Sequence, residues 1–375
     1  MSQRVPMIDL RPGLRELRAD IDAALGRVIE SGAFVNGPDV AALEREMAGY
    51  LGVAECVGLN SGTDALALGL RALGVGPGHE VVVPGFSFFA TAEAVSAVGA
   101  RPVFADIDPH SFNLAPQSVE RVLTRHTRAI VPVHLYGQAA PMAPLLELAE
   151  QRGLLVLEDV AQALGGSYRG RKLGSLGHAA ALSFFPSKTL GALGDAGMLA
   201  TNSSEVAEAC RQLRQHGSRR PWGHDKYQHE RIGHNSRLDS LQAAVLRVKL
   251  PRLGQALAAR RLAAAHYDEL LSDLAGLSTP WRDPDAEHVF HQYTLRVRAG
   301  ARDRTYDALA AHGIQTMVYY RTPLHRLPVY QAAYAALCLP EAEAASDSVL
   351  SLPLWPEISR AAQREVADAL RSALA

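Results

Sequence analysis

Two short stretches of this 375-residue chain decide its fold: residues 158–163, which read EDVAQA, and residues 183–188, which read SFFPSK. The first places the carboxylate of Asp159 at the end of a predicted buried strand. The second places Lys188 in a turn bracketed by small residues. An acid that holds a pyridinium nitrogen and an amine that forms an imine are the two parts that a pyridoxal phosphate enzyme needs.

Both residues also have ordinary explanations. Asp159 could belong to a structural ion pair, and most lysines lie at the surface. However, Lys188 lies between an apolar strand and a glycine-containing turn at residues 191–197, a poor place for a solvated charge. Partial desolvation there would lower the lysine pKa and favour imine chemistry. The turn also resembles a loose dinucleotide fingerprint, but the required strand and downstream acid are missing, which excludes a nicotinamide site.

Strands and helices alternate on both sides of these stretches. We predict helices at residues 15–31 and 40–51, then strands at 80–83, 102–105, 129–133 and 154–157, separated by helices at 63–73, 90–98, 118–123 and 143–151. Such alternation indicates a mainly parallel sheet covered on both faces. Polar residues that follow such strands line the ligand crevice, and here they are Asp106, His134, Glu158 and Asp159.

The pattern changes at residues 238–261, a predicted long helix rich in Leu, Ala and Arg. A strand at residues 293–297 and helices at 303–312 and 359–374 follow it. We therefore predict a large domain at residues 1–245, including the N-terminal helix, and a small C-terminal α/β domain at residues 246–375.

Composition limits the classes of partner and compartment. The chain is 48% hydrophobic and 21% charged, with a net charge of −1, so we expect neither nucleic acid nor a membrane surface as a partner. The three cysteines are scattered, which argues against a disulfide framework. Residues 1–9 contain no apolar segment of a secretory signal. We expect a cytoplasmic protein.

Histidines raise the alternative of a metal site. None of them shows the helical pairing or the cysteine companions of a zinc site, so we expect no bound metal. The six that invite this reading are His216, His224, His229, His234, His291 and His325.

Two further motifs have a functional and an ordinary interpretation. Residues 60–66, NSGTDAL, open a helix whose free N–H groups would attract a phosphate, although Ser61 or Thr63 could simply cap the helix. Residues 84–91, PGFSFFAT, place three aromatic side chains after a strand. One of them could stack on a cofactor ring, and at least one packs in the core.

Taken together, these blocks resemble the sugar aminotransferases of the DegT/DnrJ/EryC1/StrS family, which belong to the fold type I pyridoxal phosphate enzymes. The resemblance runs through nearly the whole chain, at residues 31–40, 61–66, 88–91, 158–162, 183–188, 233–239, 323–325 and 351–354. It implies a mainly parallel seven-stranded sheet covered by helices, a smaller C-terminal α/β domain, and a homodimer with shared active sites.

The resemblance also implies roles for residues around the cofactor. Lys188 would bind pyridoxal 5′-phosphate covalently and move a proton between the substrate carbon and the cofactor. Asp159 would pair with the ring nitrogen, Phe88 would stack on the ring, and Gln162 would lie beside it.

The remaining roles concern the phosphate and the acceptor. Gly62, Thr63 and Ser183 would hold the cofactor phosphate, and Asn235 is expected to reach it from the other subunit. Candidates for the sugar-nucleotide pocket are His325 and Tyr320.

The implied reaction moves an amino group from L-glutamate to a nucleotide-linked keto-sugar. Relatives that dehydrate sugars have histidine in place of the lysine, so Lys188 favours transamination. Asp195 and residues 226–233 look more like members that aminate the C3 carbon, which favours a dTDP-3-keto-6-deoxyhexose. The alternatives are C4 amination of a dTDP- or UDP-4-keto-sugar, amination of a ketocyclitol, and a non-catalytic relative that binds the cofactor and acts as a regulatory subunit.

Overall fold

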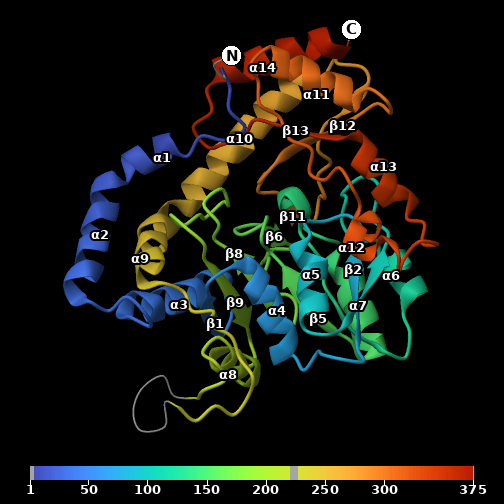
Figure 1. Cartoon of the computed structure of the whole chain (residues 1–375). Coiled ribbons are helices and arrows are strands. Elements are labelled where there is room, and N and C mark those ends of the chain that lie inside the picture. The colour runs from blue at the N-terminus through green and yellow to red at the C-terminus, as the bar shows by residue number, and fades with distance from the viewer. Residues whose placement is uncertain (1–3, 220–226, 375) are drawn as a thin grey trace.

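The computed structural model describes residues 4–219 and 227–374, and its centre is a seven-stranded sheet (Figure 1). In spatial order the strands are β1 (Glu55–Leu59), β9 (Gly197–Thr201), β8 (Ala179–Ser183), β5 (Leu155–Asp159), β4 (Thr127–Ile130), β2 (Glu80–Pro84) and β3 (Arg101–Ala105). β9 runs antiparallel to its two neighbours, β1 and β8, and all other neighbouring strands are parallel. The predicted mainly parallel sheet is therefore confirmed.

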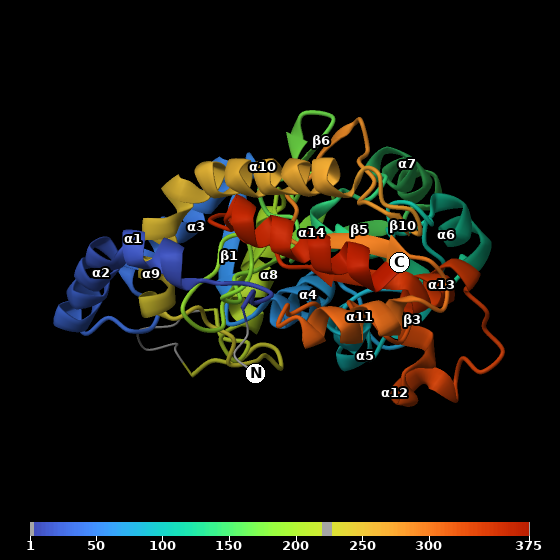
Figure 2. The ribbon, with the colours of Figure 1, turned by 90° about the horizontal axis from the view of Figure 1, so that it is seen from above.

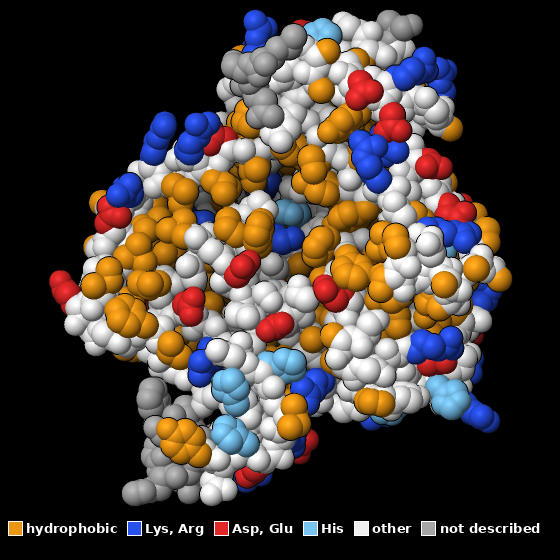
Figure 3. All heavy atoms as spheres, viewed as in Figure 1, with side chains coloured by type: hydrophobic (Ala, Val, Ile, Leu, Met, Phe, Trp, Pro, Cys, Tyr) orange, Lys and Arg blue, Asp and Glu red, His pale blue; other side chains and the backbone are white. Residues whose placement is uncertain are grey.

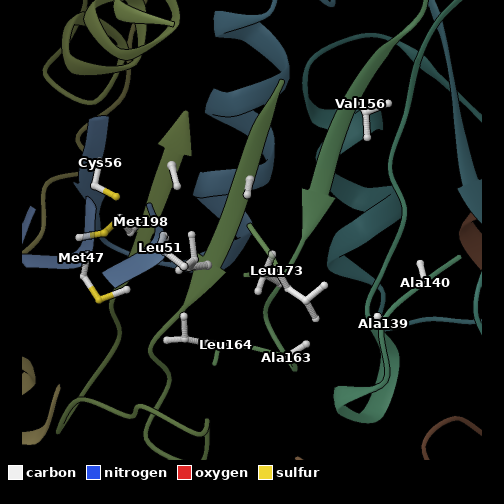
Figure 4. Packing of buried hydrophobic residues seen from close by; sticks show 14 of the residues in the cluster. Met47, Leu51, Cys56, Ala139, Ala140, Val156, Ala163, Leu164, Leu173 and Met198 are labelled. Atoms are coloured by element: carbon white, nitrogen blue, oxygen red, sulfur yellow. The ribbon is translucent and has the colours of Figure 1, made fainter. Parts of the chain in front are cut away.

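Successive side chains of the strands enter two different cores, as the two-residue period of a strand requires. Val81 and Val83 pack in the core on one face, whereas Val82 packs in the core on the other. Figure 4 shows part of the second core, in which Met47 and Leu51 of a helix lie beside strand residues. Both faces are buried, which explains why the strands read as continuous apolar runs.

Helices cover both faces of this sheet. One core includes residues of α3 (Pro38–Leu51), α6 (Pro116–Val122) and α7 (Met142–Arg152), and the other includes α4 (Gly62–Ala72), α5 (Ala90–Ala97) and α8 (Ser204–Leu213). The single helix predicted at residues 15–31 is two helices, α1 (Arg11–Glu16) and α2 (Arg18–Ser31). They meet at Leu17, whose ψ of 6° departs from helical geometry.

The long helix predicted at residues 238–261 is also interrupted. α9 (Ser240–Lys249) is followed by the 3₁₀ turn η2 (Leu250–Arg252) and then by α10 (Leu253–Leu271). Pro251 lies in the turn, and a proline inside a helix removes one backbone hydrogen bond. The strand predicted at residues 129–133 ends at Ile130.

A second, antiparallel sheet forms the C-terminal part, with strand order β10 (Leu277–Ser278), β12 (Tyr293–Val297) and β13 (Val349–Leu352). Its own core includes residues of α10, α11 (Arg302–Ala311) and α14 (Arg360–Leu374). α10 and α14 pack side by side (Figure 2). The smaller C-terminal α/β unit is thereby present, while the boundary at residues 245/246 stays a prediction.

Short elements complete the chain. A third small sheet joins β11 (Ala286–Glu287), β6 (Ser167–Tyr168) and β7 (Arg171–Lys172), and the remaining elements are η1 (Leu135–Gly137), η3 (Leu324–Arg326), α12 (Pro328–Gln331) and α13 (Pro340–Ser348). Within residues 4–219 and 227–374, no helix is both long and apolar enough to span a bilayer.

Candidate active site

Asp159 ends β5 at the carboxyl edge of the parallel strands, and its side chain is almost completely buried. Its Oδ1 accepts a hydrogen bond from the Ala161 N–H at 3.1 Å, and its Oδ2 accepts one from the Thr91 hydroxyl at 3.0 Å. Burial raises the pKa of this carboxyl, while these two hydrogen bonds and the Lys188 ammonium oppose the rise. A buried carboxylate in this setting favours a cationic partner.

Thr91 is the residue of this site to which the sequence assigned no role. It lies in the first turn of α5, is 1% exposed, and also exchanges a hydrogen bond with the Ser87 hydroxyl at 3.0 Å. The strand β2 that precedes α5 lies two strands from β5 in the sheet, so only the folded topology brings Thr91 to Asp159. The signal in the sequence that could have indicated this contact was the hydroxyl of Thr91 at the end of the aromatic motif, residues 84–91.

Lys188 lies in the turn that follows β8, where its N–H donates to the Phe185 carbonyl at 2.8 Å. The side chain is partly buried, and in the part of the chain that the structure describes its ammonium makes no hydrogen bond or ion pair. Burial lowers the pKa of Lys188 to about 8, although the Asp159 carboxylate pulls it upward. The predicted lowering of the lysine pKa is confirmed in direction.

The start of α4 forms a cradle of backbone N–H groups. The Ser61 side chain caps the helix by accepting from the Asp64 N–H at 3.1 Å. The N–H groups of Gly62 and Thr63 have no acceptor among residues 4–219 and 227–374. A Cβ added to Gly62 would lie 2.7 Å from the Ser183 Cβ, so only glycine lets β8 approach this helix start. The cradle suits an anion of phosphate size.

Aromatic and amide side chains stand beside Asp159. The Phe88 ring is 55% exposed and lies 6.1 Å from the Tyr320 ring. Gln162 accepts from the Tyr136 N–H at 2.7 Å and donates to the Tyr320 hydroxyl at 3.1 Å. These bonds fix the orientation of the Gln162 amide, and the exposed Phe88 ring is free to take up a planar ligand.

Neither Asn235 nor His325 makes a hydrogen bond to this cluster within residues 4–219 and 227–374. Asn235 is exposed, and its backbone forms an isolated antiparallel β-bridge with Gln215. Its expected contact with the phosphate of another subunit stays a prediction. His325 is completely buried and its Nε2 lies 3.0 Å from the Glu343 carboxylate. This burial leaves no surface for a substrate, so the role predicted for His325 is not one that the geometry favours.

Three of the four polar residues expected to line the crevice form hydrogen bonds to other parts of the protein. Asp106 accepts from the Glu341 and Ala342 N–H groups and so caps α13. Glu158 and His134 are completely buried and lie 3.1 Å apart.

The hydrogen bonds of this pair determine the histidine tautomer. The His134 Nδ1 accepts from the Ala140 N–H at 3.0 Å, so its proton is on Nε2, which donates to Glu158. Glu158 also accepts from three backbone N–H groups, those of Gly174, Leu176 and Gly177. The pair therefore supports the strand ends beneath Asp159 and does not line the crevice.

No group of three or more His, Cys, Asp or Glu side chains that could hold a metal ion occurs among the described residues. His224, one of the six histidines considered above, lies outside them, as does Lys226 of the 226–233 stretch.

One face of the molecule is hollowed near its centre (Figure 3). Figure 3 shows basic and histidine side chains at the bottom of this hollow and hydrophobic side chains around it. The exposed large hydrophobic residues of the chain include Phe34, Val35, Phe88, Phe185 and Leu193.

The donor set fits pyridoxal phosphate. Asp159 offers a buried carboxylate to a ring nitrogen, Lys188 offers an amine of lowered pKa, and the α4 start offers N–H groups to a phosphate. This fold and this site define a fold type I pyridoxal phosphate enzyme. The sequence matches the DegT/DnrJ/EryC1/StrS aminotransferase family over residues 15–371, and the chain belongs to that family. It is an aminotransferase, as the sequence predicted.

Similar proteins extend over almost the full length of the chain. The pleiotropic regulatory protein of Geobacillus stearothermophilus is 46% identical and covers 97% of each sequence. The dTDP-3-amino-3,4,6-trideoxy-alpha-D-glucose transaminase of Streptomyces venezuelae is 45% identical, over 98% of this chain and 96% of the relative. The crystal structure of S. venezuelae DesV in complex with a ketimine intermediate has a TM-score of 0.93 at 44% identity, over 99% of this chain and 98% of that chain.

Proposed function

We propose that the protein transfers an amino group from L-glutamate to a nucleotide-linked keto-sugar, with a dTDP-3-keto-6-deoxyhexose as the favoured acceptor. The observation that carries this proposal is that buried Asp159 and Lys188, whose pKa is lowered, lie close enough for their charges to act on each other at the edge of the parallel strands. The S. venezuelae transaminase named above acts on a dTDP-linked 3-amino sugar, which supports the C3 position and the nucleotide. C4 amination and ketocyclitol acceptors stay as alternatives.

Each side chain of the site has a separate role toward the cofactor. Bound pyridoxal phosphate supplies an electron sink that stabilises negative charge at the substrate carbon. Asp159 would hold the ring nitrogen in its protonated form, and the N–H groups of Gly62 and Thr63, together with Ser183, would hold the phosphate. Phe88 would stack on the ring.

Lys188 is the base. Because its pKa is lowered to about 8, about a tenth of the amine is neutral near pH 7, far more than at its usual pKa, and this neutral form can accept a proton at Nζ. In the donor half-reaction it would move a proton from the α-carbon of the donor to the cofactor, and in the acceptor half-reaction it would move a proton from the cofactor to the sugar carbon. We infer that Tyr320, whose hydroxyl accepts a hydrogen bond from Gln162, contacts the sugar.

We also propose a homodimer in the cytoplasm. Exposed hydrophobic side chains such as those of Phe34 and Phe185 favour burial against a second copy. In such a dimer Asn235 would reach the phosphate of the neighbouring site. The cysteines Cys56, Cys210 and Cys338 are free, which supports a reducing compartment.

The second candidate is a regulatory protein that binds the cofactor without catalysis. The name of the G. stearothermophilus relative favours it. Against it, a binding-only protein needs no base at Lys188 with a lowered pKa.

The visible spectrum of the purified protein separates these functions. We expect a yellow absorption that bleaches with L-glutamate and returns with 2-oxoglutarate, and no such response in Lys188→Met. A yellow wild-type protein that is indifferent to L-glutamate would contradict the proposed donor and favour the regulatory function. Product analysis with matched 3-keto and 4-keto nucleotide sugars then identifies the position that is aminated.

A further inference from the structure

Arg260 is a buried cation without an anionic partner. It lies in the middle of α10 and is 3% exposed. Its Nη1 donates to the carbonyls of Phe290 at 3.2 Å and Leu354 at 3.4 Å. No carboxylate lies within 4.0 Å of its guanidinium in residues 4–219 and 227–374. Burial lowers the pKa of Arg260 to about 10, since an unpaired charge in the interior is costly.

The guanidinium borders a cavity that also reaches Lys188. The cavity has a volume of about 230 Å³ and lies between α1, α10 and the segment that follows β13. At roughly 30 Å³ per water molecule in the liquid, it has room for a ligand of amino-acid size. Lys188 and Arg260 both line it, so a small molecule held at Arg260 shares a cavity with the catalytic lysine.

The acidic groups of the cavity are accounted for. Asp9 pairs with Arg11 at 2.9 Å, and Glu16 and Glu357 are the other carboxylates in the wall. Glu357 is close enough for its charge to act on Arg260, but burial raises the pKa of its carboxyl and it makes no ion pair with the guanidinium. These groups leave Arg260 without a direct counter-ion.

A neighbouring histidine also lacks a partner. His291 is 6% exposed, and its buried Nδ1 has no hydrogen bond. Burial and then the positive charges of Lys188 and Arg260 lower its pKa, so its imidazole is neutral and two cations act on this interior region. A ligand in the cavity that brings negative charge would give Arg260 the counter-ion that it lacks.

We propose that Arg260 binds a carboxylate group of the amino-acid donor from within this cavity, next to Lys188. The proposal rests on the proposed aminotransferase function and identifies which residue recognises the donor. An arginine binds a carboxylate through two parallel N–H···O bonds, and the charge of the donor replaces the missing counter-ion.

The test compares two neighbouring arginines in the cofactor-loaded protein. Arg261 follows Arg260 in α10 but pairs with Glu287 at 3.3 Å and does not line the cavity. We would measure the L-glutamate concentration that half-saturates bleaching of the yellow absorption. Calorimetry would give the dissociation constant of glutarate, a dicarboxylate without an amino group.

Arg260→Gln should raise both quantities by about 10-fold to 100-fold, the value expected for a hydrogen-bonded charge pair. Arg261→Gln should leave both within about two-fold. The yellow absorption itself and the reaction of the aminated protein with the keto-sugar should be unchanged in Arg260→Gln, because neither needs the donor carboxylate.

A second variant guards against misfolding. Ala259 also lines the cavity, and Ala259→Leu fills part of it with a good helix former while keeping Arg260. It should weaken glutarate binding as well. Wild-type glutamate saturation in Arg260→Gln, or unchanged glutarate binding in Ala259→Leu, would overturn the inference while leaving the aminotransferase function intact. A wild-type protein that does not react with L-glutamate would overturn the proposed function and this inference together.

Discussion

The replacement Lys188→Met should make the protein without cofactor more stable at neutral pH. The lysine is partly buried, and its pKa falls from 10.5 to about 8 in the folded chain. That difference corresponds to about 3 kcal/mol of stability lost below pH 8, where both folded and unfolded chains carry the charge. Because part of the side chain reaches water, screening reduces the effect, and we expect a gain of about 1–3 kcal/mol in Lys188→Met.

The stability difference between Lys188→Met and the wild type should depend on pH. Between about pH 8 and pH 10.5 the unfolded chain keeps the proton on this lysine while the folded chain releases it. The free energy of unfolding of the wild type therefore rises with pH in that window, and the advantage of Lys188→Met should shrink toward zero.

Urea unfolding of both proteins without cofactor, at one protein concentration and at pH 7, 9 and 10.5, measures the difference. The cofactor must be removed because it reacts with the amine. A Lys188→Met protein that is less stable than the wild type at pH 7, or an advantage that does not change with pH, would refute the reasoning.

Two further substitutions, Gly62→Ala and Thr91→Val, test the cofactor contacts, and Gly49→Ala is the control for the first. Gly62→Ala brings a methyl group within 2.7 Å of Ser183 and should cost at least about ten-fold in cofactor affinity, measured by equilibrium dialysis; Gly49→Ala, with no atom within 4 Å, should retain the cofactor and gain up to about 1 kcal/mol. Thr91→Val removes a hydrogen bond of about 1.5–3 kcal/mol to the Asp159 carboxylate. The pKa of Asp159 then rises further, so the acidic limb of the pH–rate profile of transamination should move to higher pH. An unchanged acidic limb would contradict the hydrogen bond between Thr91 and Asp159.

Some features of the fold could be predicted from the sequence because they depend on local residue patterns. Continuous apolar runs such as Val81 to Val83 predicted strands buried on both faces, and the sheet confirms this. Breaks within helices were missed at Leu17 and at Pro251. Apolar periodicity continues across such a break, so the pattern alone does not locate it.

The site was readable only in part, for the same reason. A lysine after an apolar strand and an aspartate at a strand end are visible as residue types, and the lowered pKa of Lys188 could be predicted in direction. Glu158 and His134 have the same appearance in the sequence, yet they pair with each other below the strand ends. Successive strand residues point to opposite faces, so neighbours in the motif perform different tasks.

The sequence by itself determined the class of enzyme, because its chemistry requires particular residue types at Asp159 and Lys188 and its sheet requires apolar strands. Tertiary structure alone decided which other side chains meet them. Thr91 reaches Asp159 from a separate strand–helix unit, and Arg260 reaches the cavity beside Lys188 from a helix that follows the large sheet. These contacts depend on how distant elements pack, and the free energy of a buried charge depends on every group around it.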